Sequence, residues 1–184
     1  WLYEAGLGEN RAALIDDGGI IEAHVEPSSA DVRAGTIAPA RLRANRIAVM
    51  DDGAEALLDA VPAKLTEAAR IMIQISREAL SEPGRPKRAK ARLVPPDIEI
   101  SDGPTLLDRV STSGFRVTTL SPRDPDRLEE FGWSECLEHA ASGDIRGERV
   151  SLRISLTPAM TLIDVDGSYA PLSLAIEGVQ VAAA

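Results

Sequence analysis

The sequence predicts an α+β protein that is rich in β structure. Short runs in which apolar and polar residues alternate recur along the chain, and such runs are typical of half-buried strands. Turn-forming pairs such as Asp-Gly and Pro-Gly separate them. Helix signals are confined to short stretches in the second half. With 184 residues, 44% apolar and 3% aromatic, the chain can build one sizeable core or two small ones from Leu, Ile, Val and Ala.

The first predicted element is a β-hairpin. Residues 11–16 and 19–26 form two short runs around Asp17-Gly18, and Asp-Gly is among the strongest hairpin turn signals. His24 lies in the second run without a partner nearby in the sequence. We expect it to be a partly exposed strand histidine rather than a catalytic one.

A small barrel is predicted next. Strands are expected over residues 36–42, 46–51 and 70–77, with a last strand near Leu93; in the third, Ile71, Ile73 and Ile75 alternate with less apolar residues. Several short strands within about 60 residues are typical of a barrel of the oligonucleotide-binding kind. No aromatic residue lies between Tyr3 and Phe115, so this barrel offers no platform for base stacking. It is expected to be structural or to bind phosphate weakly.

The second half contains the helix signals. Residues 106–110 suggest a short helix and residues 115–120 a strand. Ser134 is placed to cap a helix that runs to Ala141, and Gly143 is placed to end it. One face of this helix would carry Cys136, Leu137, Ala140 and Ala141, which predicts that the cysteine is a core residue.

Residues 150–166 predict a second hairpin. Its first strand should turn Val150, Leu152, Ile154 and Leu156 toward a core. Thr157-Pro158 forms the turn, and residues 160–166 return as a strand. Because residues two apart in a strand point to the same side, Asp164 and Asp166 project together.

This carboxylate pair is the candidate metal site. Two neighbouring carboxylates repel each other, and Mg²⁺ or Mn²⁺ would relieve the repulsion. The alternative is that Asp166-Gly167 is simply a turn signal with exposed aspartates. Spacing alone favours the turn.

The candidate nucleic-acid contact is a basic run. A formal charge of -9 opposes non-specific binding to nucleic acid, which depends on neutralising phosphates. The charge is uneven, however, and five cations fall within eight residues: Arg85, Lys87, Arg88, Lys90 and Arg92. They form either a local track for nucleic acid or a solvated loop, and the run taken alone favours the solvated loop.

Residues 151–167 resemble the catalytic strand pair of the ribonuclease E/G family. The matching letters are Thr157-Pro158-Ala159-Met160 and Ile163-Asp164-Val165-Asp166-Gly167, where the family has Thr-Glu-Ala-Met/Leu and Ile-Asp-Ile/Val-Asn. Residues 131–141 are similar to the helix that precedes this pair. Shorter matches to the family's opening hairpin and to the start of its inserted S1-like barrel are Glu9, Arg11, Ala13-Leu14, Asp17-Gly18, Ile21-Glu22 and Gly35-Thr36-Ile37.

The resemblance implies a domain arrangement and an activity. Residues 1–27 would be a hairpin of an RNase H-like region, residues 28–97 a reduced S1/OB-like barrel, and residues 98–184 the front part of the catalytic subdomain. The implied reaction is Mg²⁺- or Mn²⁺-dependent endoribonuclease hydrolysis of single-stranded RNA, in RNA processing or decay. Asp164 matches the family's first catalytic metal ligand, and Asp166 stands where the family usually has a positioning asparagine.

The chain departs from the family in other respects. The family's second metal-ligand aspartate lies on a later strand, so we expect this chain to be the front portion of the enzyme. Residues 98–149 are too few for the family's 5′-end sensor domain. The cysteine-rich zinc link that joins subunits is absent, so any homo-oligomer would need another contact. Two alternatives remain: a non-catalytic RNA-binding or scaffold relative, and an unrelated acidic β-rich domain.

The predicted location is the cytoplasm. A single cysteine, Cys136, excludes an intramolecular disulfide and suits a reducing compartment. No stretch approaches the ~20 consecutive apolar residues that span a bilayer. One cysteine and two isolated histidines cannot make a structural zinc site within one chain.

Overall fold

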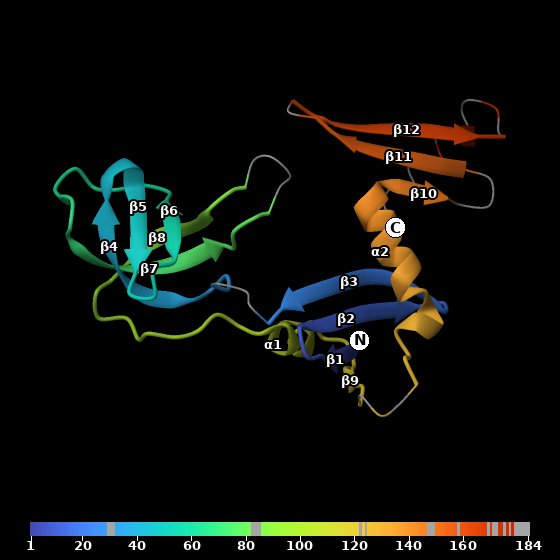
Figure 1. Ribbon diagram of the computed structural model, residues 1–184, viewed down its shortest axis with the longest axis horizontal. Helices are drawn as coiled ribbons and strands as arrows, with labels where there is room; N and C mark the ends of the chain where they lie inside the picture. Colours follow the sequence, from blue (N-terminus) through green and yellow to red (C-terminus); the bar gives the residue numbers. More distant parts are fainter. Residues whose placement is uncertain are drawn as a thin grey trace. The chain divides into compact units, whose positions relative to one another are not determined.

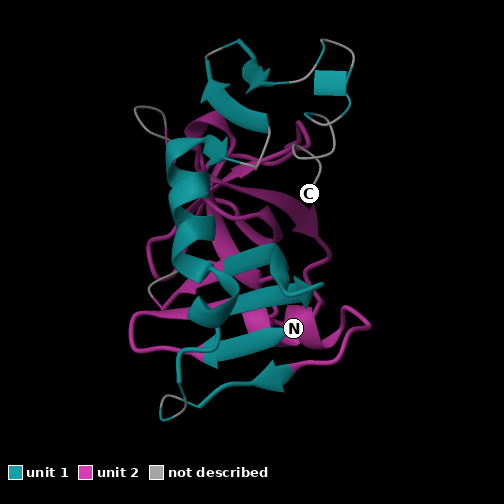
Figure 2. Cartoon of the chain, turned by 90° about the vertical axis from the view of Figure 1, so that its right-hand side faces the viewer, with its two compact units in different colours: residues 1–4, 12–24, 118–184 teal, residues 5–11, 25–117 magenta. Residues whose placement is uncertain are grey.

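The computed structural model describes residues 1–28, 32–81, 86–121, 123, 125–146, 150–157, 159–168, 170, 173, 174, 176 and 178. The chain divides into two compact units, coloured separately in Figure 2. Unit 1 comprises Trp1–Glu4, Ala12–His24 and Thr118–Ala184. Unit 2 comprises Ala5–Arg11 and Val25–Val117. None of the described helices is long and apolar enough to cross a membrane.

A four-stranded sheet contains the N-terminal hairpin. Its order is β3-β2-β1-β9, with β1 at Leu2–Ala5, β2 at Glu9–Asp16, β3 at Gly19–Pro27 and β9 at Thr118–Thr119. Asp17 and Gly18 have φ of 45° and 81°, the left-handed pair that a tight two-residue hairpin requires. The predicted hairpin and its turn are therefore confirmed.

The strand predicted over residues 115–120 is mostly wrong. Only Thr118 and Thr119 are paired, in parallel with Leu2 and Tyr3. The preceding Gly114 has φ of 86°, and Phe115 is 60% exposed. Because Gly114 is left-handed and Phe115 is not buried, the strand does not begin until residue 118.

Unit 2 contains a closed five-stranded barrel, shown in Figure 1. Its strands are β4 (Ile37–Arg43), β5 (Ile47–Met50), β6 (Glu55–Leu58), β7 (Arg70–Arg77) and β8 (Ala89–Val94). The closed order is β4-β5-β6-β8-β7, with β6 and β8 parallel and the other pairs antiparallel. A short 3₁₀ turn, η1 (Ala44–Arg46), joins β4 to β5. The barrel has the strand number of a small OB-like barrel.

Alanines and larger non-aromatic apolar side chains fill the barrel. Ile73 and Ile75 are almost fully buried and alternate with more exposed neighbours, as the sequence predicted for a strand. The rest of the buried set is aliphatic: Ala40, Leu42, Ala48, Met50, Ala56, Leu58, Ile71, Ala89 and Ala91. Five alanines leave room for the larger residues, which explains how a barrel without aromatic side chains is packed.

The sequence prediction missed β6. This strand has only four residues, Glu55–Leu58, of which Ala56 and Leu58 are buried. Four residues are too few for alternation to stand out in the sequence. In the barrel, β6 is nevertheless essential, because it joins β5 to β8 and so closes the ring.

Two helices were predicted at nearly correct positions. Helix α1 is Leu106–Ser111 and begins with a capping box between Thr105 and Asp108. Helix α2 is Trp133–Ser142, follows the 3₁₀ turn η2 (Glu129–Phe131), and ends at Gly143, as expected.

The N-cap and the buried face predicted for α2 are wrong. Gly132, in a left-handed conformation, is the N-cap, and the Ser134 hydroxyl instead donates to Oε2 of Glu129 at 2.7 Å. The expected core face is not formed: Leu137 is 39% exposed, Ala140 and Ala141 are exposed, and Cys136 is half-buried. Trp133 is the buried residue of α2, in a cluster with Leu2, Ala13, Leu120 and Leu128.

A three-stranded antiparallel sheet completes the described part of unit 1. Its strands are β10 (Asp144–Arg146), β11 (Val150–Leu156) and β12 (Thr161–Gly167), with β11 in the centre. The second predicted hairpin is therefore confirmed, although Pro158 of its turn lies outside the described residues. The inward set was only partly correct, because Val150 and Leu152 are buried whereas Leu156 is 81% exposed.

Candidate functional site

The carboxylates of Asp164 and Asp166 lie on the outer strand of the three-stranded sheet. Both residues are exposed, with half-buried Val165 between them. Asp164 pairs with Arg153 across the β11–β12 ladder, and Asp166 pairs with Ser151. Since residues two apart share a side of a strand, the two carboxylates stand together as the sequence predicted.

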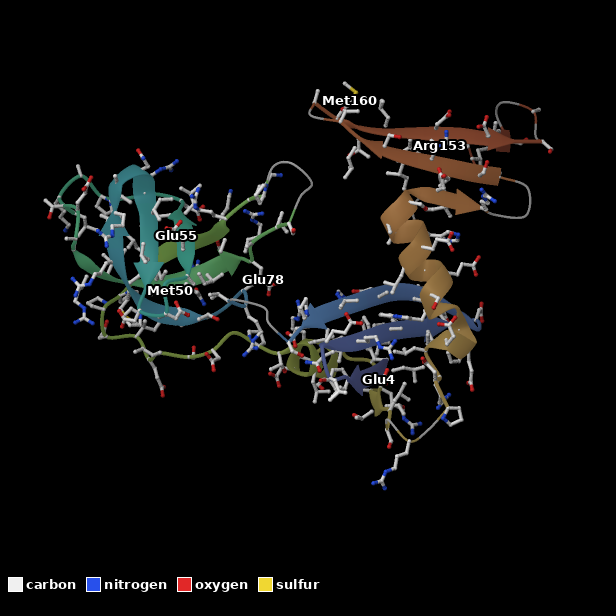
Figure 3. All side chains as sticks on the ribbon, viewed as in Figure 1. Glu4, Met50, Glu55, Glu78, Arg153 and Met160 are labelled. Atoms are coloured by element: carbon white, nitrogen blue, oxygen red, sulfur yellow. The ribbon has the colours of Figure 1, made fainter. Side chains whose placement is uncertain are left out.

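Arg153 is the cation of this face. On β11 it lies between Asp144 of β10 and Asp164 of β12, because it is the pairing partner of both; Figure 3 labels it. Its Nε donates to Oδ1 of Asp144 at 2.9 Å. This hydrogen bond, then the negative charges of Asp144, Asp164 and Asp166, raise the pKa of the Arg153 guanidinium. The arginine therefore stays charged beside the aspartates.

The sequence prediction overlooked Arg153, although a signal was present. Arg153 falls between Leu152 and Ile154 in an alternating strand, which places it on the side away from Leu152. Which residue it faces depends on the hairpin register, which only the structure gives: Leu156 pairs with Thr161, and counting back from that pair brings Arg153 opposite Asp164.

The carboxylate pair fits a divalent cation in ligand type. Mg²⁺ prefers oxygen ligands, commonly takes one or two protein carboxylates, and completes its shell with water and substrate phosphates. Asp164 and Asp166 provide two exposed carboxylates on one side of a strand. Within the described part of the chain, no group of three or more His, Cys, Asp or Glu side chains could hold a metal ion. Any cation here would depend on waters or on a bound phosphate.

Two residues of the predicted basic run, Lys90 and Arg92, are built into the barrel. Arg85 lies outside the described residues. Lys90 and Arg92 are exposed residues of β8 and alternate with buried Ala89 and Ala91, so both point out of the barrel. Arg88 and Lys87 precede the strand and are also exposed.

Arg88 and Arg92 have anionic or polar partners. Nε of Arg88 donates to Oε2 of Glu55 at 2.9 Å, and Figure 3 labels Glu55 on β6. The Arg92 guanidinium donates twice to Oε1 of Gln74, at 3.1 and 2.7 Å. Exposed pairs of this kind contribute little to stability, so both arginines can exchange these partners for phosphate oxygens.

A shallow pocket lies among these cations. It has a volume of about 250 Å³ and is lined by Ile47, Leu57, Arg77, Lys87, Arg88 and Lys90. Arg77 was not predicted. Its Nη2 donates to the Arg88 carbonyl at 2.9 Å, while its Nε is buried without a hydrogen-bond partner among the described residues. The exposed lining of the pocket is apolar, so an anionic ligand would meet the charged ends of these four residues at its rim.

The barrel is basic although the chain is acidic. Residues 37–94 contain eleven Lys and Arg and seven Asp and Glu, whereas the whole chain contains 20 and 29. The acidic excess therefore lies outside the barrel. The net charge of -9 consequently does not oppose phosphate binding at the barrel itself.

The two histidines occupy ordinary positions. His24 lies 2.7 Å from Oε1 of Glu22, and its ring is 5.6 Å from that of Trp1. His139 lies 3.9 Å from Glu135, one turn earlier on α2. His139 and Cys136 also border a largely apolar pocket of about 840 Å³, whose described lining contains no Lys or Arg. This pocket therefore lacks the charge that a phosphate ligand needs.

Comparison with protein-family models gives no match, and comparison with curated protein sequences gives none either.

Proposed function

We propose that this protein is a metal-dependent endoribonuclease of the ribonuclease E/G type that hydrolyses single-stranded RNA. The observation that carries the proposal is the exposed pair Asp164 and Asp166 on one side of β12. An outer strand leaves both carboxylates open to a hydrated cation and to a phosphate group. The resemblance of residues 151–167 to the family's catalytic strand pair points the same way.

The proposed roles follow from the ligand types. Asp164 and Asp166 would hold Mg²⁺ or Mn²⁺, with Asp164 as the ligand that matches the family. When bound, such a cation supplies Lewis-acid activation of water and of the phosphate. Because Asp166 replaces a neutral asparagine, it adds a second negative charge that strengthens attraction for a cation but repels the RNA backbone.

RNA binding is proposed for the basic face of the barrel. Lys87, Arg88, Lys90 and Arg92, with Arg85 from the sequence prediction and Arg77 from the pocket, would contact phosphates. No aromatic residue occurs in the barrel sequence, so bases cannot stack there. Binding should therefore depend on charge more than on base identity, and should weaken steeply with salt.

The finer fold assignment is part of the same proposal. Residues 1–27 would belong to an RNase H-like region, residues 28–97 to an S1-like barrel, and residues 98–184 to the catalytic subdomain. A cytoplasmic location fits an RNA-processing enzyme with a single cysteine.

A second candidate is an RNA-binding or scaffold protein that lacks catalysis. The position of Arg153 favours it, because a guanidinium beside Asp144 and Asp164 already supplies positive charge to the carboxylates. Such a protein would bind RNA through the barrel and leave it intact.

One assay separates the two candidates. The purified chain is incubated with 5′-labelled single-stranded RNA, with Mg²⁺ or with EDTA, beside Asp164→Asn. Asp97→Asn is the matched control, since Asp97 is an exposed carboxylate of the other unit. If the protein is an endoribonuclease, RNA cleavage should need the metal, be lost in Asp164→Asn and be kept in Asp97→Asn. Retention of intact RNA by all three proteins would support the scaffold instead, and equal cleavage by all three would reveal a contaminating nuclease.

A further inference from the structure

The pocket of about 840 Å³ beside helix α2 lies entirely within unit 1, and we call it the α2 pocket. Three parts of the unit line it: residues 20–23 of β3, one side of α2, and Ile145, Ile154 and Leu156 of β10 and β11. Small-molecule sites in proteins are mostly apolar and typically have volumes of about 300–1,000 Å³. The α2 pocket is therefore large enough for a small organic ligand.

Apolar residues with the spacing of a core are left open in the α2 pocket. On α2, Cys136 and Ala140 lie one turn apart on the same face, yet Cys136 is only half-buried and Ala140 is exposed. On β11, Leu156 continues the alternation of Ile154 but is 81% exposed. On β3, Ile21 is 48% exposed. The apolar residues of three elements thus border one space that a ligand with an apolar body would fill.

The charge of the α2 pocket is negative. Glu22 and Glu135 line it, and its described lining contains no Lys or Arg. Arg153 of β11 adjoins Ile154 in the strand, so its side chain points to the other side of the sheet. The negative charge selects among apolar ligands, because a cation is attracted to the two carboxylates and an anion is repelled.

Both carboxylates of the pocket are accessible to a ligand. The Glu22 side chain is 51% exposed and lies 2.7 Å from His24, and the Glu135 side chain is 73% exposed and lies 3.9 Å from His139. These contacts involve Oε1 of each carboxylate. Since exposed pairs of this kind hold their partners weakly, both carboxylates can also receive a cation from a ligand.

We infer that the α2 pocket binds a hydrophobic organic cation, a small molecule with an apolar body and an ammonium group. The apolar body packs against Ala140, Ile154 and Leu156, and the ammonium group lies beside the carboxylates of Glu22 and Glu135. This ligand class differs from RNA in charge and in polarity. The inference therefore goes beyond the proposed ribonuclease activity and does not depend on Asp164 or on a metal ion.

Three ligands with the same alkyl chain and different head groups test the inference. Decylammonium, decanol and decanoate are titrated, below their micelle concentrations, against the original chain loaded with a neutral naphthylamine dye that fluoresces in apolar surroundings. Decylammonium should displace the dye with an affinity about fivefold higher than that of decanol, the factor expected for one exposed charge interaction. Decanoate should bind more weakly than decanol, because its head group meets like charge.

Matched variants locate the binding in the α2 pocket. Glu135→Gln should reduce the preference for decylammonium over decanol to less than about twofold, since it removes one of the carboxylates. Glu138→Gln is its control, because Glu138 is exposed on the same helix but does not line the pocket. Leu156→Ser should weaken all three ligands. Leu162→Ser is its control: Leu162 is also exposed and belongs to the same hairpin, but lies outside the pocket.

Three outcomes would overturn the inference. The first is that neither the dye nor decylammonium binds saturably to the original chain. The second is that the three head groups bind equally, or that Glu135→Gln and Glu138→Gln have the same effect. The third is a dimer in sedimentation velocity that Leu156→Ser abolishes, because the pocket would then be covered by a second copy of the chain. RNA cleavage that depends on Asp164 judges the proposed function separately.

Discussion

The carboxylate of Glu26 accepts a hydrogen bond from the backbone amide of Leu106, 80 positions later in the chain, at 3.0 Å. Glu26 is the next-to-last residue of β3 and is only 8% exposed. Its other oxygen accepts from Nδ2 of Asn10 at 3.1 Å. Because the first amides of a helix have no partner within the helix, Glu26 satisfies a donor of α1 that its own turn cannot.

Glu26→Ala is therefore expected to destabilise unit 2. It would leave the Leu106 amide and the Asn10 side chain without their acceptor, at a free-energy cost of about 2 kcal/mol. Glu26→Gln keeps one acceptor oxygen and should lose less. Urea unfolding followed by circular dichroism measures both, and equal stability of Glu26→Ala and the original chain would contradict this role.

The capping box of α1 gives the protein a predictable response to acid. The Thr105 hydroxyl and backbone amide bond to the Asp108 carboxylate, and these hydrogen bonds lower the pKa of Asp108. A carboxyl group with a lowered pKa in the folded state binds protons more readily when unfolded, so its contribution to stability rises with pH. That contribution is complete above the ordinary carboxyl pKa and disappears as the pH falls through the lowered value.

Asp108→Asn should accordingly be less stable than the original chain at neutral pH. The difference should shrink on acidification through the carboxyl range. Thr105→Ala should cost about 1 kcal/mol at neutral pH, since it removes the N-cap. Chemical unfolding at a series of pH values checks both, and a difference between Asp108→Asn and the original chain that grows toward acid would refute the assignment.

The barrel pocket predicts a salt-dependent contact with RNA. Lys87→Gln combined with Lys90→Gln removes two of its four cations, and should lower the slope of log binding constant against log salt by about 0.7 per lost phosphate contact. Lys64→Gln is the control, because Lys64 is exposed in the same unit but does not line the pocket. An identical slope in all three proteins would assign these lysines to a solvated surface.

Gly143 joins α2 to the sheet that carries the aspartates. It has φ of 72°, its carbonyl accepts from the Ile154 amide at 2.7 Å, and an added Cβ would collide with the Ile154 carbonyl oxygen. Gly143→Ala should therefore destabilise unit 1 by about 2 kcal/mol, from left-handed strain together with the collision.

Gly18→Ala is the control that separates the backbone strain of a left-handed alanine from the collision with Ile154. Gly18 also has a positive φ, 81°, but an added Cβ would meet nothing within 4 Å. Gly143→Ala should have a lower thermal unfolding temperature than Gly18→Ala. The reverse order would show that the contact with Ile154 relaxes at little cost in free energy.

Local patterns in the sequence predicted most of the strands. Asp17-Gly18 predicted the first hairpin, and alternation at Ile71, Ile73 and Ile75 predicted β7. The capping of α2 was harder. Ser134 is a suitable N-cap residue, yet Gly132 takes the position because its left-handed conformation ends η2 and begins α2 in one step.

Burial was predicted less well than strand position. Leu156 alternates with the buried Val150 and Leu152 but is 81% exposed. Periodicity shows which residues share a side of a strand, whereas burial requires another element to cover that side. The same limit applies to Leu137, Ala140 and Ala141 on α2.

For the candidate site, the sequence alone determined that Asp164 and Asp166 share one side of a strand, because that follows from the two-residue period of the extended chain. Only the tertiary structure decided that Arg153 stands opposite Asp164, and that short β6 closes a barrel with an outward basic strand. Neighbours across strands depend on register and on chain closure, which are relations between distant residues that no local pattern contains.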